Sequence, residues 1–201
     1  MKRRREPPPW ALLSFLLRYP DDDVRAAVAE IVALPPGPAR DALERFAAEW
    51  DGDPAHYVET FDLRRRASLD LTYYAHGDTR NRGMALLRLK KLYRAAGLPM
   101  DSAELPDHLV VMLAFAALAP PGHGEAVLTE HRAPLELLRL SLHDLGSPYA
   151  HVLDAIAALL PALSVSQRSE VARLAHDGPP DEAVGLEPYG PPEAMPAGAR
   201  A

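Results

Sequence analysis

The sequence predicts an all-α protein that folds as a single-domain helical bundle. Of its 201 residues 48% are hydrophobic, mainly Leu and Ala, whereas aromatic residues make up only 6%. Leu and Ala are good helix formers, and the β-branched and aromatic residues that strands favour are few. Apolar residues recur at three- and four-residue steps along most of the chain, as they do on one face of a helix. No repeat of fixed period is found, which argues against a solenoid.

The helical domain is expected at residues 8–176. Residues 1–7 are predicted to be a flexible basic leader. Residues 177–201 are predicted to be a disordered tail, because six prolines and several glycines interrupt them and apolar periodicity is almost lacking. The early apolar run is too short for a signal peptide, and no segment approaches the roughly 18 apolar residues that span a bilayer. We therefore expect a cytoplasmic protein that reaches a membrane only through a partner.

The first half of the domain is predicted to contain four helices. The first covers residues 10–19, and the second covers residues 21–34, opening with acids that suit the positive end of a helix dipole. Prolines then interrupt the chain before a third helix, which ends at the turn formed by Asp51 and Gly52. A fourth helix starts at Asp53 and Pro54, which favour helix starts, and is predicted to run without a break to His76.

The second half begins with a helix at residues 79–96, after a turn at Gly77. The wholly apolar run at residues 109–118 is predicted to be a buried helix at the centre of the core. Residues 120–124 are predicted to be a loop, followed by an amphipathic helix that ends near Leu145. Two more helices are expected, at residues 149–160 and 164–175, the former after a glycine stop and a first-turn proline.

Residues 57–97 form a basic island in an acidic chain. They contain nine Arg or Lys and four acids, a balance of +5, in a protein of net charge −6. The island could contact nucleic acid, bind a phosphate-bearing cofactor or an acidic partner, or be a solvated helix face. A chain with a pI near 5.7 would repel a polyanion elsewhere on its surface, so nucleic acid is not expected.

The triplet Arg64 to Arg66 should bring at least one arginine toward the core, because three successive helical positions fan over about 200°. A buried arginine needs an acidic partner, for which the candidates are Asp62, Asp70, Glu104 and Asp107. The pair Tyr73 and Tyr74 beside the polar turn suits protein recognition. Half-buried helix packing explains the two tyrosines equally well, and the sequence leaves both interpretations open.

Catalytic and metal-binding patterns are lacking in the sequence. There are no cysteines, which excludes disulfides, thiolate metal sites and cysteine nucleophiles. None of the eight histidines stands three or four residues from another, the spacing that would place a metal between them on one helix. No glycine-rich phosphate loop and no nucleophile elbow occurs. We therefore expect neither an enzyme nor a metal site.

Two segments carry a resemblance to a known family. The run at residues 57–97, YVETFDLRRRASLDLTYYAHGDTRNRGMALLRLKKLYRAAG, closely resembles the diagnostic segment of the nitrate reductase molybdenum cofactor assembly chaperones of the NarJ type. The element Glu104-x-x-Asp107-His108, within ELPDHLVVMLAF, is similar to the signature of the wider TorD-like group of molybdoenzyme chaperones, in which it precedes a core helix. Together these segments cover about a quarter of the chain.

This resemblance implies an all-helical cytoplasmic chaperone that is not part of the finished enzyme. Such a chaperone binds the catalytic (alpha) subunit of respiratory nitrate reductase, notably its N-terminal segment. It holds that subunit competent for molybdenum cofactor insertion and delays its docking to the membrane. No cofactor would be bound permanently, although transient contact during maturation is allowed. The residues that match the motifs, and are therefore candidates for partner binding, are Arg64, Arg65, Tyr73, Tyr74, His76, Gly77, Asp78, Asp107 and His108.

Two other functions remain open at the level of the sequence. The protein could be a carrier that binds the phosphate-bearing molybdenum cofactor directly through Arg80, Arg82, Arg88 and Lys90 beside a glycine-containing turn. It could also be a generic helical adaptor with unrelated partners. The sequence leaves the oligomeric state undetermined.

Overall fold

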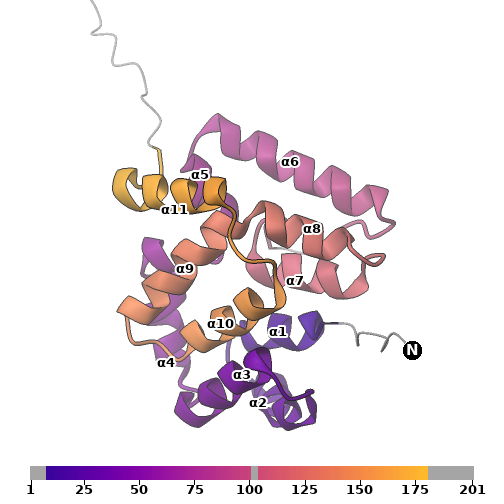
Figure 1. Ribbon diagram of the computed structural model, residues 1–201, viewed down its shortest axis with the longest axis vertical. Coiled ribbons are helices and arrows are strands. Elements are labelled where there is room, and N and C mark those ends of the chain that lie inside the picture. The colour runs from indigo at the N-terminus through magenta and orange to yellow at the C-terminus, as the bar shows by residue number, and fades with distance from the viewer. Residues whose placement is uncertain (1–7, 101–103, 181–201) are drawn as a thin grey trace, which may run out of the picture.

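The computed structural model describes residues 8–100 and 104–180, which form helices joined by short loops (Figure 1). Their only β-type pairing is an isolated antiparallel bridge between Asp70 and His108. The predicted all-α fold is confirmed. The helices are α1 (Trp10–Leu16), α2 (Asp22–Ala29) with a 3-10 turn (Glu30–Ala33), α3 (Pro38–Glu49), α4 (Pro54–Tyr57) with a π turn (Val58–Asp62), a 3-10 turn (Arg65–Ala67), α5 (Leu71–His76), α6 (Arg80–Ala95), α7 (Leu109–Leu118), α8 (His123–Glu130), α9 (Arg132–Asp144), α10 (Tyr149–Leu159) and α11 (Val165–Asp177).

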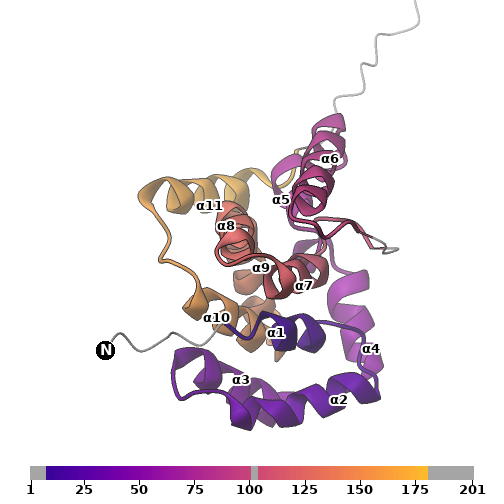
Figure 2. The same cartoon turned by 90° about the vertical axis from the view of Figure 1, so that its right-hand side faces the viewer.

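The helices are arranged in levels along the long axis of the molecule. Figure 2 shows α2 and α3 at one end, α1 and α10 in the middle, and α6 and α11 at the other end. The middle level holds the core, where Leu13 and Leu16 of α1, Leu113 of α7 and Ile156 of α10 are almost completely buried. Helix α1 thus lies inside the domain, although it stands near the start of the chain.

An aromatic cluster around Tyr149 joins the first helices to α10. The Tyr149 ring is fully buried, and its centroid lies 4.9 Å from that of Phe61 and 5.6 Å from that of Phe46. The indole N–H of Trp50 donates a 3.0 Å hydrogen bond to the Tyr149 hydroxyl. A buried tyrosine needs such a partner for its polar end, and the cluster therefore fixes α3 against α10.

The prediction of one unbroken helix from Asp53 to His76 is wrong. The helix widens into a π turn at Val58–Asp62, a 3-10 turn follows, and α5 begins only at Leu71. The break has a distant cause. The N–H of Leu71 donates to the carbonyl oxygen of Asp107 (3.1 Å), and the N–H of Leu109 donates to that of Leu69 (2.8 Å). Because this pairing requires an extended backbone before α5, local helix propensity is overridden.

The expectation that one of Arg64 to Arg66 approaches the core is also wrong. All three side chains are exposed, because the chain has left the helix and no longer directs these positions inward. The arginine that points inward is instead Arg82 of α6, whose side chain is only 15% exposed. Two of the predicted acidic partners, Asp70 and Asp107, do face an arginine, but that arginine is Arg82.

The apolar run at residues 109–118 forms a helix as predicted, but it is not buried on all sides. Leu109 and Leu113 of α7 are fully buried, whereas Leu118 is 72% exposed. The following helix, α8, was not predicted, since it begins at His123 within the expected loop at residues 120–124. Pro120 and Gly122 are helix-breaking residues, so the local sequence predicts a loop there. Packing against α7 nevertheless stabilises the first turn of α8.

Only the beginning of the predicted tail lies within the described residues. Asp177 is the last residue of α11. The carbonyl oxygen of Pro180 lies so close to Gly77 that a Cβ atom at that glycine would overlap it. The predicted leader at residues 1–7 and the rest of the tail lie outside the described residues, so the domain limits at 8 and 176 remain predictions. No described helix has both the length and the apolar character needed to cross a membrane.

Two glycines in helices give opposite predictions for substitution by alanine. At Gly124 a Cβ atom would overlap the backbone and side chain of Ala116 on α7, whereas at Gly83 of α6 it would meet nothing within 4 Å. Gly124→Ala should therefore lower the free energy of unfolding by about 1–2 kcal/mol through overpacking. The control, Gly83→Ala, should raise it by about 1 kcal/mol through helix propensity. Urea denaturation measures both, and a stabilising Gly124→Ala would contradict the close packing of α7 and α8.

His131 lies between α8 and α9 and is largely buried. Its Nδ1–H donates to the carbonyl oxygen of Val127 (2.9 Å). Burial lowers the pKa of His131 from its ordinary value of 6.5, the hydrogen bond to Val127 opposes this shift, and the charge of Arg88 adds to it. The folded protein therefore holds this histidine neutral at pH values where the unfolded chain has begun to bind a proton.

The stability of the domain should consequently fall as the pH is lowered below about 6.5, toward the depressed pKa of folded His131. The contribution is fully present above that pH. His131→Gln should reduce the dependence of the unfolding free energy on pH in this range. Measurement of the same variant at pH 8 supplies the control, because any loss there reports packing alone. An unchanged pH dependence would show that His131 is not held neutral.

Candidate functional site

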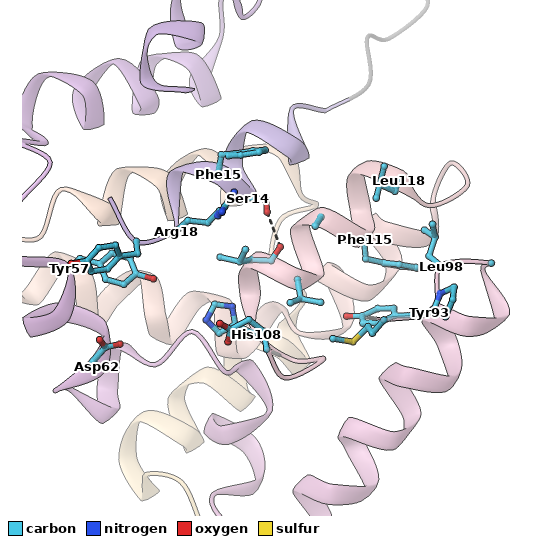
Figure 3. A pocket seen from close by; sticks show the side chains of 18 residues that line it. Ser14, Phe15, Arg18, Tyr57, Asp62, Tyr93, Leu98, His108, Phe115 and Leu118 are labelled. Atoms are coloured by element: carbon cyan, nitrogen blue, oxygen red, sulfur yellow. Dashed lines mark hydrogen bonds between the residues drawn. The ribbon is translucent and has the colours of Figure 1, made fainter. Parts of the chain in front are cut away.

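A groove of about 980 Å³ opens between α1, α7 and the chain that connects α6 to α7 (Figure 3). The solvent side of α7 supplies its floor with Val110, Val111, Ala114 and Phe115. Phe15 of α1 and Tyr19, which follows that helix, form one wall, and the connection supplies the other with Leu98, Pro99 and Met100. The groove is thus made by the face of α7 that the core leaves uncovered.

The wall formed by α1 is fixed to the floor by a hydrogen bond. The hydroxyl of Ser14 donates to the carbonyl oxygen of Val110 (2.9 Å), as Figure 3 shows. Ser14 is itself buried, so this bond is shielded from water and satisfies a polar group in the interior. Next to it, Phe15 stays 39% exposed at the groove, with the guanidinium of Arg18 5.0 Å from the ring centroid.

The opposite side of the floor is supported from α6. The ring of Tyr93 packs against Phe115 with centroids 4.4 Å apart, and its hydroxyl donates to the carbonyl oxygen of Pro106 (2.7 Å). Burial raises the pKa of Tyr93 above its ordinary value, and the negative charge of Asp107 adds to that rise. Tyr93 is therefore a neutral hydrogen-bond donor that holds the start of α7 against α6.

The two ends of the groove differ in chemistry. Leu98, Phe115 and Leu118 gather at one end, whereas Asp62 and His108 lie at the other (Figure 3). The Nδ1 atom of His108 is buried and has no hydrogen-bond partner among the described residues. An unpaired buried polar atom costs about 1–3 kcal/mol, and a bound molecule that supplied the missing partner would recover part of this. The polar end can therefore form directional hydrogen bonds with a bound molecule, and the apolar end provides apolar surface that the molecule would bury.

Behind the polar end, Asp107 links three segments of the chain. Its side chain is fully buried, and one carboxylate oxygen accepts from both the N–H (3.1 Å) and the hydroxyl (2.5 Å) of Thr72. This oxygen thereby satisfies a free amide in the first turn of α5, as a helix cap would, although it stands 35 residues away. An Nη2 atom of Arg82 lies 3.6 Å from the same oxygen and 2.8 Å from Asp70.

Three carboxylates surround the guanidinium of Arg82. Burial raises the pKa of Asp70, and the neighbouring charge of Asp107 adds to this, while the hydrogen bond from Arg82 opposes it. Asp78 pairs with the other side of the guanidinium at 3.3 Å. The guanidinium also lies 5.8 Å from the ring centroid of Tyr73. The guanidinium of Arg82 thus interacts with three carboxylates and an aromatic ring, and these contacts connect α6 to α5 and to the start of α7.

Three of the candidate partner-binding residues are in buried structural positions. Tyr74 is buried, and its hydroxyl lies 3.0 Å from the carbonyl oxygens of both Arg66 and Ser68. Gly77 adopts a φ of +54°, which favours glycine, and closes α5. Asp107 is buried as described above. The structure supports the packing interpretation for Tyr74. Tyr73 is half-buried and lies beside Arg82.

The remaining candidates divide between the groove and the surface. His108 lines the groove. Arg64 and Arg65 are exposed away from it, and Arg64 lies 3.9 Å from Glu59. His76, in the last turn of α5, lines a small cavity of about 200 Å³ with His131. Asp78 is an exposed partner of Arg82. The structure therefore does not bring the predicted residues together in one place.

The cations of the alternative carrier interpretation do not converge on one phosphate site. Arg82 faces Asp70 and Asp107 on the inner side of α6, whereas Arg88 forms an ion pair with Glu130 of α8. Arg80 and Lys90 are exposed at other positions around the helix. A phosphate group would need several of these side chains on one side, and the helix separates them.

Eight of the 18 groove residues lie outside both motif segments, and motif reasoning missed them. Phe15, Arg18, Leu98 and Leu118 are examples. One signal could have indicated the groove, since α7 contains only apolar residues over its whole length. A helix that is apolar all round needs partners on every side. In this chain the described helices cover only part of it.

The fold and the groove together define an all-helical domain that presents an open apolar groove. Among the described residues, no three His, Asp or Glu side chains are grouped as ligands of a metal would be. Residues 20–155 match the family described as nitrate reductase delta subunit, which is more than half of the chain. The protein belongs to this family, and the resemblance to the NarJ type is confirmed.

Individual relatives agree with this assignment. The chain is 40% identical over 152 residues to the nitrate reductase-like protein NarX of Mycobacterium tuberculosis, covering 73% of this chain and 23% of NarX. It therefore spans about a quarter of that relative. It is 33% identical over 172 residues to the probable nitrate reductase molybdenum cofactor assembly chaperone NarJ of Bacillus subtilis, covering 81% of this chain and 94% of the relative. With the NarJ chaperone of Escherichia coli K12 it shares 34% identity over 160 residues, or 74% and 67% of the two chains.

Substitution of Asp107 tests whether its carboxylate holds α5 and α6 in place. Asp107→Asn keeps the shape of the side chain but leaves buried Arg82 without its inner charge, and should lower the unfolding free energy by about 3 kcal/mol. Asp78→Asn is the matched control, because Asp78 pairs with the same arginine but is 69% exposed; it should cost less than about 1 kcal/mol. Equal losses in urea denaturation would refute the structural role of Asp107.

Proposed function

We propose that this protein is a cytoplasmic chaperone that binds the N-terminal segment of the catalytic subunit of nitrate reductase in the groove along α7. In this proposal it holds the subunit competent for insertion of the molybdenum cofactor and delays membrane docking until maturation. The single observation that carries the proposal is the open apolar groove beside the family motif, with Leu118 72% exposed. Assembly chaperones among the relatives support the choice of client.

The shape of the groove suits an amphipathic helix. Helix α7 has ten residues and is therefore about 15 Å long, so two or three turns of another helix can lie along it. The apolar face of such a segment would cover Val111 and Ala114, which are partly exposed, and remove them from water. Binding of a helix in an apolar groove is a recurrent mode of peptide recognition, and its affinity comes mainly from the buried apolar area.

The polar end of the groove would set the direction in which the segment binds. Asp62 favours a cation on the client, and the free Nδ1 atom of His108 can donate to or accept from a polar group. A segment bound in reverse would place apolar side chains against these groups and lose their hydrogen bonds. Asp107 acts behind this end, by fixing the start of α7.

In this proposal, occupation of the groove by the N-terminal segment both holds the client for cofactor insertion and delays its docking to the membrane. While the chaperone covers the N-terminal segment, that segment is unavailable to other partners, so docking to the membrane waits. When the client folds around its cofactor, the segment would be withdrawn and the complex would dissociate. Contact between chaperone and cofactor would then be transient and would depend on the client.

Binding of a labelled peptide tests the groove. The peptide carries the N-terminal sequence of the nitrate reductase catalytic subunit from the same organism, and fluorescence anisotropy measures its Kd. Leu118→Glu should raise the Kd by about tenfold or more, because a charge would replace apolar contact. Val165→Glu is the matched control, since Val165 is also 72% exposed but lies on α11, outside the groove.

Equal affinity of the two variants would place the client elsewhere on the protein. If the unmodified protein does not bind the peptide, the N-terminal segment of the catalytic subunit is not the client. Co-purification with the catalytic subunit then distinguishes a dedicated chaperone from a generic adaptor, because an adaptor for unrelated partners would not retain that subunit.

A further inference from the structure

Helix α6 lies at the edge of the molecule and packs on it with one side only (Figures 1 and 2). Leu89 and Tyr93 are its buried apolar residues. The opposite side carries a stripe at steps of four and three residues, which places its members on one face of the helix. The stripe, here called the outer face of α6, consists of Arg80, Met84, Leu87, Lys91 and Arg94.

The outer face has an apolar centre and basic ends. Met84 is 67% exposed and Leu87 is 44% exposed. No acidic residue occurs anywhere in α6. Among the described residues, no carboxylate lies within ion-pair distance of Lys91 or Arg94. The outer face therefore combines apolar area with the positive charge of Lys91 and Arg94, and its complement is an acidic segment with apolar side chains.

The chain itself brings such a segment to this place. The described part ends at Pro180, whose carbonyl oxygen lies against Gly77, in the turn that leads into α6. The residues that follow, 181–189, read DEAVGLEPY. They contain three acids and no base, with Val184 and Leu186 between the acids. The segment thus follows directly on a residue at the N-terminal end of α6, and it carries the negative charge and the apolar residues that complement the outer face.

We propose that residues 181–189 bind along the outer face of α6, with Val184 and Leu186 on Met84 and Leu87. The lengths agree, because the 16 residues of α6 extend about 24 Å and nine extended residues reach about 30 Å. Covalent attachment at Pro180 gives the segment an effective concentration on the order of millimolar, which a separate acidic partner would have to exceed. This inference does not depend on the proposed client.

The consequence of this contact would be a covered basic surface. Cations and exposed apolar residues together attract acidic proteins without selectivity. A tethered acidic segment would occupy that surface and leave the groove along α7 as the accessible apolar site. The segment would also add contacts to α6, which has few of its own.

Disulfide formation in the full-length chain tests the contact, since the protein has no cysteine of its own. The test variant is Leu87→Cys with Leu186→Cys. The control is Ser169→Cys with Leu186→Cys, which places the first cysteine at an exposed position of α11. Oxidation at low salt is followed on non-reducing gels, and thermal melting checks that each variant is folded.

The test pair should close within one chain at least ten times faster than the control pair. Adding Lys91→Glu and Arg94→Glu should remove most of this advantage, because the charge attraction is lost. Equal closure rates would overturn the proposal and leave the outer face to a separate acidic partner. A disulfide-linked dimer of the test variant would overturn it as well, by assigning the outer face to a second copy of the chain.

Discussion

The buried carboxylate of Asp107 is the interaction on which the arrangement of the site depends. It caps α5 through Thr72, faces Arg82 of α6, and stands directly before the first residues of α7. The carboxylate thereby adds to other contacts between these helices, such as the packing of Tyr93 on Phe115. A buried ion pair is weak evidence for stability, because desolvation offsets much of its attraction. Its effect here is to link the helices through one oxygen, since Oδ2 of Asp107 accepts from Thr72 and faces Arg82, whereas Asp107 Oδ1 and Arg82 Nε have no hydrogen-bond partner among the described residues.

The groove follows from this arrangement. The backbone bridge between Asp70 and His108 fixes where α7 starts, and the hydroxyl of Tyr93 holds the preceding turn from α6. Helix α1 closes the other side through Ser14. The apolar floor of the groove is consequently open to solvent. Exposed apolar area of this kind reduces solubility, and its retention beside the family motif agrees with a binding role.

The central basic stretch of the sequence therefore has two separate uses. Arg82 points inward and completes the charge network around Asp107, so it belongs to the framework. Lys91 and Arg94 point outward on α6 and are available to an acidic segment. The groove lies on the other side of the α6–α7 connection and contains few charges. The framework lies among α5, α6 and α7, the groove lies along α1 and α7, and the basic face lies on α6.

The sequence alone determined the helical class, the family and most helix positions. Apolar periodicity and end signals report on neighbours three or four residues away, and they correctly placed α6, α10 and the helix that begins after Ser164, where a capping box is present. Only the tertiary structure decided that the helix breaks before Leu71, that Arg82 and not Arg64 turns inward, and that α7 has an open side. Each of these depends on contacts between residues far apart in the chain, such as Thr72 with Asp107, which local spacing does not encode.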